Sequence, residues 1–293
     1  CSLGIAFLHV SANVFNDFFD VKDGTDEANT EYFNAGLNST VLEGAQLSGG
    51  SRAIELGLIS LSGTLSPARK MLFVAFLAML ALLINSYFVT GEFSNAMNAL
   101  IIGVIGGLFG YFYTARPVRL VSRRGLGEIA VFLAFGPLLT LGAYFAISSS
   151  TIELFSKEFF NSLYIGIPFG FLTTNILYIN QFPDAVSDAK TGKNHLVVTL
   201  GKKNARWGYL FNLMCAFISS FLLVDLFNEN LIYFNKPIFL IGNGLLFLYG
   251  FSAFINLYKN FNSRNLVFSN LKTIYLQIFF GIFYVILLNL FFV

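Results

Sequence analysis

Long runs without any charged residue constrain the fold of this chain more than any other feature. Seven such runs cover residues 71–91, 93–115, 129–152, 159–183, 207–224, 237–258 and 273–293, and an eighth covers residues 1–16. A membrane-spanning helix needs about 20 apolar residues, whereas the strands of a membrane barrel would alternate in polarity. A large soluble all-α protein would need eight fully buried helices. We therefore expect an all-α, polytopic membrane bundle with eight transmembrane helices, in one domain covering residues 1–293.

The composition supports a membrane protein and excludes several functional classes. Charged residues make up 12% of the chain and hydrophobic residues 56%, whereas a soluble domain carries about twice that charged share. This excludes a disordered chain, a nucleic-acid-binding protein and an ordinary cytosolic enzyme. Two cysteines allow neither a disulfide framework nor a cysteine-rich metal site. Because the sequence begins at Cys1, inside an apolar run, we expect an N-terminally truncated chain.

The basic residues predict how the helices are oriented. If the spans alternate in direction, 16 of the 18 Lys and Arg residues fall on one side, and only Lys157 and Lys236 fall on the other. Cytoplasmic loops of membrane proteins carry the excess of Lys and Arg. We therefore expect a multi-pass protein of the cell (inner) membrane, with the basic loops in the cytoplasm.

Two acidic segments close helices on that same side. The first acidic segment, residues 13–26, places a run of polar side chains on one helical stripe: Asn13, Asn16, Asp17 and Asp20. Gly24 is expected to end this helix and to turn Asp26 back toward the stripe. The second acidic segment, residues 180–188, places three polar side chains on one face: Asn180, Asp184 and Asp188.

Carboxylates at a membrane boundary usually mark a functional site, because they are costly to remove from water. Clustered acids raise each other's pKa unless a cation joins them. Carboxylate and amide oxygens suit Mg²⁺, which completes its shell with water and substrate phosphates. Two facing acidic helix ends therefore indicate Mg²⁺ ions that bind a diphosphate. The alternative is two unrelated, solvated charge clusters.

Several groups near the two segments could contact a diphosphate. These are Arg52, Tyr113, Arg116 and Lys193. Arg and Lys neutralise charge that builds up on a leaving group. Each cation could equally be a positive-inside anchor. The two histidines have weaker signals: His195 is expected to be an interfacial loop residue, and His9 a hydrogen-bonded residue inside its helix.

The two acidic segments resemble the aspartate-rich motifs of the UbiA superfamily of intramembrane prenyltransferases. Further segments resemble its menaquinone-pathway branch, the 1,4-dihydroxy-2-naphthoate polyprenyltransferases, namely residues 48–52, 113–117 with 125–128, and 174–180. The resemblance extends from about residue 13 to residue 201. It implies a fold of nine membrane helices around a central cavity, of which eight are visible and the first is missing. Asn194 and His195 depart from the Arg-Thr pair that is usual there.

The resemblance also implies residue roles. Asn16, Asp20, Asp184 and Asp188 match the positions that bind Mg²⁺ and diphosphate and carry catalysis. Asp26 takes the third metal-binding position of the first motif, which falls on Gly24 in its more general form. Asp17 is an additional metal-ligand candidate, and Asp23 is expected to be secondary or solvated.

The resemblance implies Mg²⁺-dependent transfer of a polyprenyl group from polyprenyl diphosphate to 1,4-dihydroxy-2-naphthoate, with decarboxylation, giving a demethylmenaquinone. Two other interpretations remain open. One is a superfamily member whose acceptor is 4-hydroxybenzoate, homogentisate, a glycerophosphate or a chlorophyll precursor. The other is a transporter or channel whose acids line a cation path. Acids confined to the cytoplasmic helix ends argue against that last interpretation. The expected partners are the diphosphate, an aromatic acceptor and the lipid bilayer, with no nucleic acid.

Overall fold

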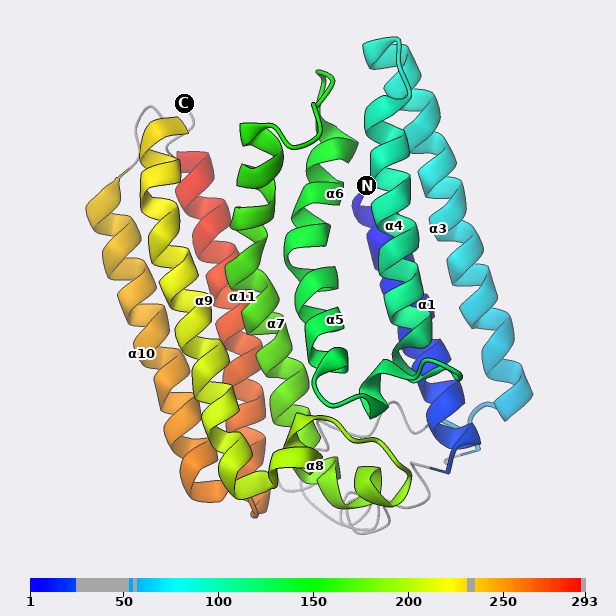
Figure 1. Ribbon diagram of the computed structural model, residues 1–293, viewed down its shortest axis with the longest axis vertical. Helices are drawn as coiled ribbons and strands as arrows, with labels where there is room; N and C mark the ends of the chain where they lie inside the picture. The colour runs from blue at the N-terminus through cyan, green and yellow to red at the C-terminus, as the bar shows by residue number, and fades with distance from the viewer. Residues whose placement is uncertain (25–52, 55–56, 231–234, 291–293) are drawn as a thin grey trace.

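The computed structural model describes residues 1–24, 53–54, 57–230 and 235–290, and in these residues the secondary structure is entirely helical. The long helices run side by side along the bundle, and the short α8 lies at one end (Figure 1). Their bounds are α1 Ser2–Lys22, α3 Leu61–Thr90, α4 Ser94–Thr114, α5 Leu126–Phe135, α6 Pro137–Ile147, α7 Lys157–Lys190, α8 Leu196–Leu200, α9 Lys202–Asn230, α10 Lys236–Asn260 and α11 Val267–Leu290. Two short 3₁₀ helices, η1 (Leu120–Ser122) and η2 (Arg264–Leu266), precede α5 and α11.

The expected all-α membrane bundle is confirmed. In the described part of the chain, seven helical segments are long and apolar enough to cross a membrane. The expected span at residues 129–152 differs in detail, because it is divided into α5 and α6. The division falls where Pro137, which has no N–H to donate, begins α6. The eighth expected span, residues 1–16, lies within α1. That helix is not among the seven, because polar residues such as Asn13, Asn16 and Asp17 occupy its second half.

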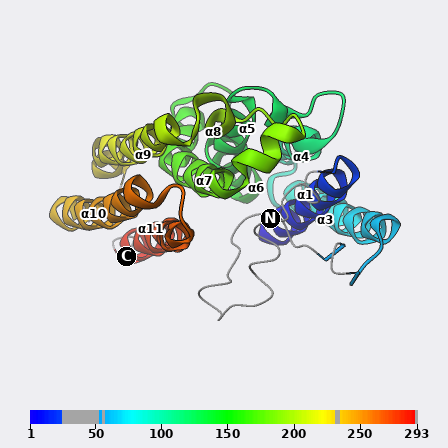
Figure 2. The same cartoon turned by 90° about the horizontal axis from the view of Figure 1, so that it is seen from below.

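Helix α7 lies at the centre of the bundle. Seen along the helices, α10 and α3 lie on opposite sides of it (Figure 2). Helices α5, α6, α9 and α11 all pack on α7, whereas α1 packs mainly on α3 and α4. Half of the most apolar stretch of α7 is buried, and none of that of α3 is. The apolar surface of α3 is therefore available to lipid.

Glycines allow α7 to approach α5 and α6 closely. A Cβ atom on Gly166 would lie 2.6 Å from the carbonyl oxygen of Gly136, and one on Gly170 would lie 2.6 Å from that of Phe132. Small residues at such contacts are typical of membrane helices, whose association depends on close packing. The glycines therefore set how closely α7 packs against α5 and α6.

The apolar core is concentrated on the other side of α7. Its largest cluster joins α7, α9, α10 and α11 through side chains that include Leu172, Phe217, Phe239 and Phe280. A second cluster lies nearer α8 and includes Tyr178, Phe182, Tyr209 and Leu257. Because this core extends to the end of α7, the second acidic segment is built on a buried helix.

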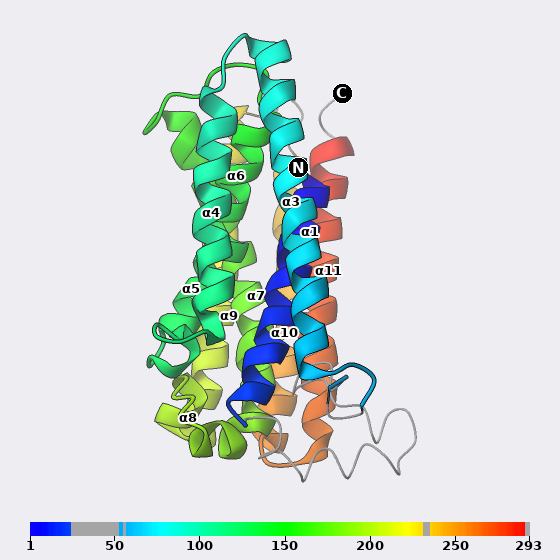
Figure 3. The ribbon, with the colours of Figure 1, turned by 90° about the vertical axis from the view of Figure 1, so that its right-hand side faces the viewer.

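The connections rich in Lys and Arg lie at one end of the bundle. The C-terminal end of α1 lies at the same end as α8, as two perpendicular views show (Figures 1 and 3). The connection from α4 to α5 is also at this end (Figure 1). This arrangement brings both acidic segments to the same end of the molecule.

Candidate functional site

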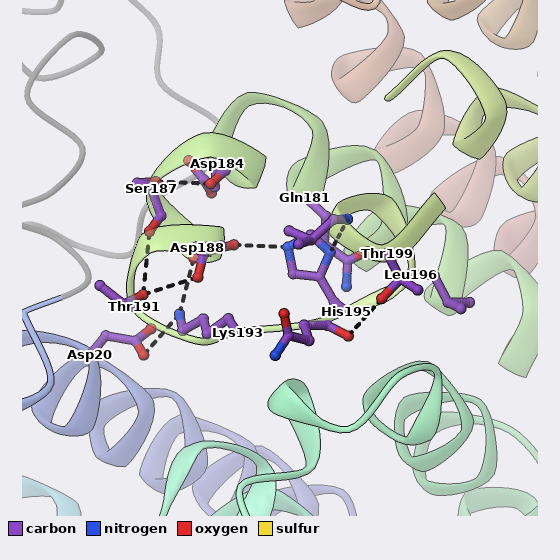
Figure 4. A network of polar contacts seen from close by, with 12 residues as sticks. Asp20, Gln181, Asp184, Ser187, Asp188, Thr191, Lys193, His195, Leu196 and Thr199 are labelled. Atoms are coloured by element: carbon purple, nitrogen blue, oxygen red, sulfur yellow. Dashed lines mark hydrogen bonds and ion pairs between the residues drawn. The ribbon is translucent and has the colours of Figure 1, made fainter. Parts of the chain in front are cut away.

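The two acidic segments meet at Lys193. Its Nζ atom lies 2.9 Å from Asp20 Oδ1 of the first segment and 3.6 Å from Asp188 Oδ1 of the second (Figure 4). The Lys193 and Asp188 side chains are each 9% exposed, and that of Asp20 is 22% exposed. One ammonium group therefore joins two helix ends that are more than 160 residues apart in the sequence.

The end of α7 explains how Lys193 reaches this position. After Lys190 the chain reverses over Thr191 and Gly192, and Gly192 has a positive φ of 77°, which favours glycine. The reversal is closed by a hydrogen bond of 2.9 Å from the Lys193 N–H to the Asp188 carbonyl oxygen. This turn folds Lys193 back over the helix that carries Asp188.

His195 lies in the loop before α8, as expected, but its side chain is buried and paired with an acid. His195 is 1% exposed, and its Nε2 atom lies 3.0 Å from Asp188 Oδ2. Its Nδ1 atom accepts a hydrogen bond of 3.4 Å from the Val198 N–H and caps α8. No sequence pattern indicates this contact, because a single histidine after a polar turn has no periodicity. His9 agrees with its expectation, since its ring lies 3.3 Å from the Asn13 amide one turn further along α1.

A buried glutamate anchors the chain beside His195. Glu128 of α5 is 5% exposed. Its Oε1 atom accepts hydrogen bonds from Gln181 Nε2 of α7 (3.1 Å) and from the Leu196 N–H (2.9 Å). Glu128 and Gln181 had no assigned role in the sequence analysis. A buried carboxylate needs hydrogen-bond donors. The only sequence feature that could have indicated this contact is the position of a glutamate at the edge of an apolar run.

Polar contacts hold the end of α1 in place. Asn16 Oδ1 accepts a hydrogen bond of 2.8 Å from the Thr114 hydroxyl of α4. Asp23 lies 3.2 Å from Arg119 Nη2 and 3.6 Å from Arg116 Nη2. Asp23 was expected to be secondary or solvated, but it is half-buried and paired with two arginines.

Arg119 is a further residue that sequence reasoning did not single out. It is buried, and its Nη1 atom donates a hydrogen bond of 3.1 Å to the Thr191 carbonyl oxygen. Arg119 thus contacts both the end of α1, through Asp23, and the turn that carries Lys193. Arg116, which the sequence favoured as a diphosphate contact, has a side chain that is 73% exposed.

The remaining expected site residues are less tightly gathered. Asp184 is half-buried one turn before Asp188, and Asp17 is half-buried on α1. Tyr113 lies against Gly127 at the start of α5, because a Cβ atom added to Gly127 would lie 3.2 Å from the Tyr113 ring. Asn180 is engaged elsewhere, since it accepts a hydrogen bond of 2.6 Å from Asn270 of α11. Asp26 and Arg52 lie outside the described residues, so their expected roles stay predictions.

The environment of Asp20 combines burial with a nearby cation. Asp20 lies beyond the apolar part of α1, and burial raises the pKa of its carboxyl above the usual value. The Lys193 ammonium acts in the opposite direction, while the Asp188 and Asp17 carboxylates add to the rise. A cation close to Asp20 therefore stabilises its ionised form.

The site offers few metal ligands, but they are of the kind that Mg²⁺ prefers. Among the described residues, no group of three or more His, Cys, Asp or Glu side chains could hold a metal. Asp20 and Asp188 nevertheless converge on one cation, the Lys193 ammonium. Mg²⁺ commonly takes one or two protein carboxylates and completes its shell with water and substrate phosphate. Asp20 and Asp188 fit that mode of binding.

Comparison with known proteins places the chain in a family. Residues 58–272 match the UbiA prenyltransferase family. This stretch contains the second acidic segment and begins after α1, so the first acidic segment lies outside it. None of the solved structures matches the chain at a significant level.

Three relatives are informative. A UbiA prenyltransferase domain-containing protein 1 of Dictyostelium discoideum is 30% identical over 63% of this chain and 50% of its own length. A 1,4-dihydroxy-2-naphthoate octaprenyltransferase of Escherichia coli is 28% identical over 75% of the chain and 61% of its own length. The Bacillus subtilis protein of the same name is 24% identical, over 68% and 53%. The chain thus spans half to three-fifths of the length of these relatives.

Proposed function

Because the chain belongs to the UbiA prenyltransferase family, we propose that it transfers a polyprenyl group from a polyprenyl diphosphate to 1,4-dihydroxy-2-naphthoate. The acceptor loses CO₂, and the product is the reduced, quinol form of a demethylmenaquinone. The observation that carries this proposal is the meeting of Asp20 and Asp188 at the Lys193 ammonium. Two carboxylates from different helix ends, with a lysine ammonium between them, suit a magnesium diphosphate, which needs both carboxylate ligands and a cationic contact for phosphate.

In this proposal the acidic side chains hold Mg²⁺, with Asp20 and Asp188 as its main ligands. Asp184, Asp26 and Asp17 are further candidates, and Asn16 supplies an amide oxygen at the first segment. Bound Mg²⁺ would withdraw electron density from the diphosphate oxygens and make diphosphate a better leaving group. The same carboxylates repel a diphosphate that arrives without its metal, so the site favours the metal complex.

The basic side chains act on the leaving group. Lys193 is the best placed, because it is buried between the two acids, and its ammonium can neutralise charge as the allylic C–O bond breaks. The electron pair of that bond leaves with diphosphate and an allylic cation remains. Arg116 and Arg52 are proposed as outer diphosphate contacts. Arg119 supports the site indirectly, because it pairs with Asp23 and donates a hydrogen bond to a carbonyl oxygen in the turn that holds Lys193.

The aromatic interior suits the second half of the reaction. Tyr113 lies on the helix next to the first acidic segment, and the face of an aromatic ring can stabilise a nearby cation. An apolar surrounding also keeps water from capturing that cation. A ring carbon of the acceptor then forms the new C–C bond, and CO₂ departs from that position.

Two of the relatives support the naphthoate acceptor through their names, 1,4-dihydroxy-2-naphthoate octaprenyltransferase. Their identities of 24% and 28% leave other acceptors as the alternative, among them 4-hydroxybenzoate, homogentisate, a glycerophosphate and a chlorophyll precursor. The excess of basic residues at the end that carries the site supports a multi-pass protein of the cell (inner) membrane, with its site facing the cytoplasm.

Product analysis tests the proposed reaction. The purified protein in detergent is given Mg²⁺, one polyprenyl diphosphate and each aromatic acceptor in turn, and products are analysed by mass spectrometry. We expect a naphthoate product whose mass lacks CO₂ relative to simple addition. Prenylated 4-hydroxybenzoate as the sole product would contradict the naphthoate acceptor. D20A and D184A should lose pyrophosphate release, whereas K190A, which changes an exposed lysine of α7, should retain it.

A further inference from the structure

His195 is a buried imidazole with both ring nitrogens engaged, and the proposed reaction does not use it. Nε2 lies 3.0 Å from Asp188 Oδ2, and Nδ1 accepts from the Val198 N–H at 3.4 Å. A carboxylate accepts hydrogen bonds, so Nε2 carries the proton that is donated to Asp188. Nδ1 faces an N–H donor, so it presents its lone pair. The two contacts therefore select a single tautomer of the ring.

The backbone around His195 fixes where the ring can lie. Leu196 N–H donates to Glu128 Oε1, which also accepts from Gln181 Nε2. These bonds connect the start of α8 to both α5 and α7. The backbone next to His195 is therefore tied to α5 and α7, and the ring itself is buried and capped on α8. These contacts restrict movement of the ring relative to Asp188.

The consequence falls on the Asp188 carboxylate. Its Oδ2 atom is taken by His195, and its Oδ1 atom lies 3.6 Å from Lys193 Nζ, on the side of Asp20 (Figure 4). Without the donor on Oδ2, the carboxylate plane could turn about the Cβ–Cγ bond. With it, the plane is held so that one oxygen faces His195 and the other faces the side where the two acidic segments meet. Hydrogen bonds to ligating carboxylates commonly fix ligands in this way.

We propose that His195 is a positioning residue that donates from Nε2 to Asp188 and so directs the other carboxylate oxygen into the diphosphate site. The inference deepens the proposed function and rests on it, because the role of Asp188 toward Mg²⁺ is part of that proposal. His195 exchanges no proton with substrate. Its effect is on how well Asp188 is oriented before metal and diphosphate arrive.

Two variants with amide side chains each remove or weaken one of the two hydrogen bonds of the imidazole and keep the other. In H195N the amide oxygen stands where Nδ1 was, so the α8 cap is kept and the donor to Asp188 is lost. In H195Q the amide nitrogen reaches the position of Nε2, so the donor is kept and the cap is weakened. We expect H195N to bind Mn²⁺, measured by electron paramagnetic resonance without substrate, about tenfold more weakly, with its unfolding midpoint retained. H195Q should bind Mn²⁺ nearly as well as the parent. Unchanged Mn²⁺ affinity in H195N, or equal losses in both variants, would overturn the proposal.

Nitrogen NMR tests the pairing without metal or activity. The chain has two histidines, so ¹⁵N-histidine labelling gives two sets of ring signals, and H9Q identifies those of His195. We expect His195 to show the tautomer protonated at Nε2, with an Nε2 shift that moves in D188N. The opposite tautomer, or a signal that D188N leaves unmoved, would contradict the proposal.

The variant D188A distinguishes failure of this inference from failure of the proposed function. If D188A abolishes pyrophosphate release while H195N leaves Mn²⁺ affinity unchanged, the positioning role of His195 is wrong and the proposed function stands. If D188A retains full pyrophosphate release, the site assigned to the reaction is wrong. The NMR spectrum still decides in that case whether His195 holds Asp188.

Discussion

The two acidic helix ends are built in different ways. Helix α7 carries Asp188 on a surface that is buried along much of its length, whereas Ser11 is the one fully buried residue among the described residues of α1. The Asp188 side chain is 9% exposed and that of Asp20 is 22% exposed. A turn and α8 follow the end of α7. Hydrogen bonds to Glu128 from Gln181 of α7 and from the Leu196 N–H of α8 hold this region in place. The end of α1 meets its surroundings through Asn16, Asp20 and Asp23.

Because of this difference, we expect α7 to govern the stability of the fold and the end of α1 to govern assembly of the site. Close packing against α5, α6, α9 and α11 holds α7, and van der Waals packing is a main contribution to helix association in lipid. Polar contacts and ion pairs hold the end of α1, and their strength depends on charge and geometry. We therefore expect changes around α7 to unfold the protein, and changes around the end of α1 to separate Asp20 from Asp188 in a protein that remains folded.

Glycine substitutions test the difference in packing. A Cβ on Gly170 would meet the Phe132 carbonyl oxygen at 2.6 Å, one on Gly110 would meet Ala12 Cβ at 2.9 Å, and one on Gly103 would meet nothing within 4 Å. We expect G170A to lower the free energy of unfolding by about 3 kcal/mol and G110A by about 1 kcal/mol. G103A, the matched control in an open helix position, should be neutral or slightly stabilising. Denaturation in mixed micelles measures all three, and a larger loss in G110A than in G170A would reverse the comparison.

Replacing Lys193 tests the contact between the two ends. K193Q leaves the Asp20 and Asp188 carboxylates without their shared ammonium, so we expect pyrophosphate release to fall about 100-fold. Mg²⁺ should raise the unfolding midpoint of K193Q more than that of the parent, because a bound cation would replace the lost charge. K190Q, which removes an exposed cation from the last turn of α7, serves as the control. Identical responses of K193Q and the parent to Mg²⁺ would argue against convergence of the two acids.

Two neighbouring arginines test what holds the end of α1. Arg119 is buried against Asp23 and Thr191, so R119A should lower the free energy of unfolding by about 2 kcal/mol. R119A should also speed the hydrogen exchange of backbone amides in residues 191–196. Arg116 is 73% exposed, and an exposed pair contributes at most about 1 kcal/mol, so R116A should change little. Equal effects of R119A and R116A on exchange would mean that the turn is not anchored through Arg119.

Much of the fold and the main acids of the site were predictable from the sequence. Charge-free runs identify the spans, because lipid tolerates few unpaired charges. The spacing of Asp20, Asp184 and Asp188 at helix ends indicated a shared site, and the structure joins two of them through Lys193. These features depend on periodicity and on the side of the membrane, and both are properties of local sequence.

The contacts that complete the site were not predictable in the same way. His195, Glu128 and Arg119 act through partners that only the packing of α5, α7 and α8 brings near. Each is a single polar residue next to an apolar run or a basic loop, a pattern that an interfacial residue shares. The break at Pro137 does not interrupt the charge-free run of residues 129–152, so that run predicts one span where the structure has two helices.

A double-variant measurement tests the central claim, that the two acidic helix ends form one site. Pyrophosphate release from a polyprenyl diphosphate is measured for D20N, for D188N and for the two changes combined, at saturating Mg²⁺ and acceptor. Residues that act as a unit give non-additive losses. We predict that the combined variant loses little more than the more damaged single variant. Losses that multiply in the combined variant would show that Asp20 and Asp188 act independently, and would contradict a shared site.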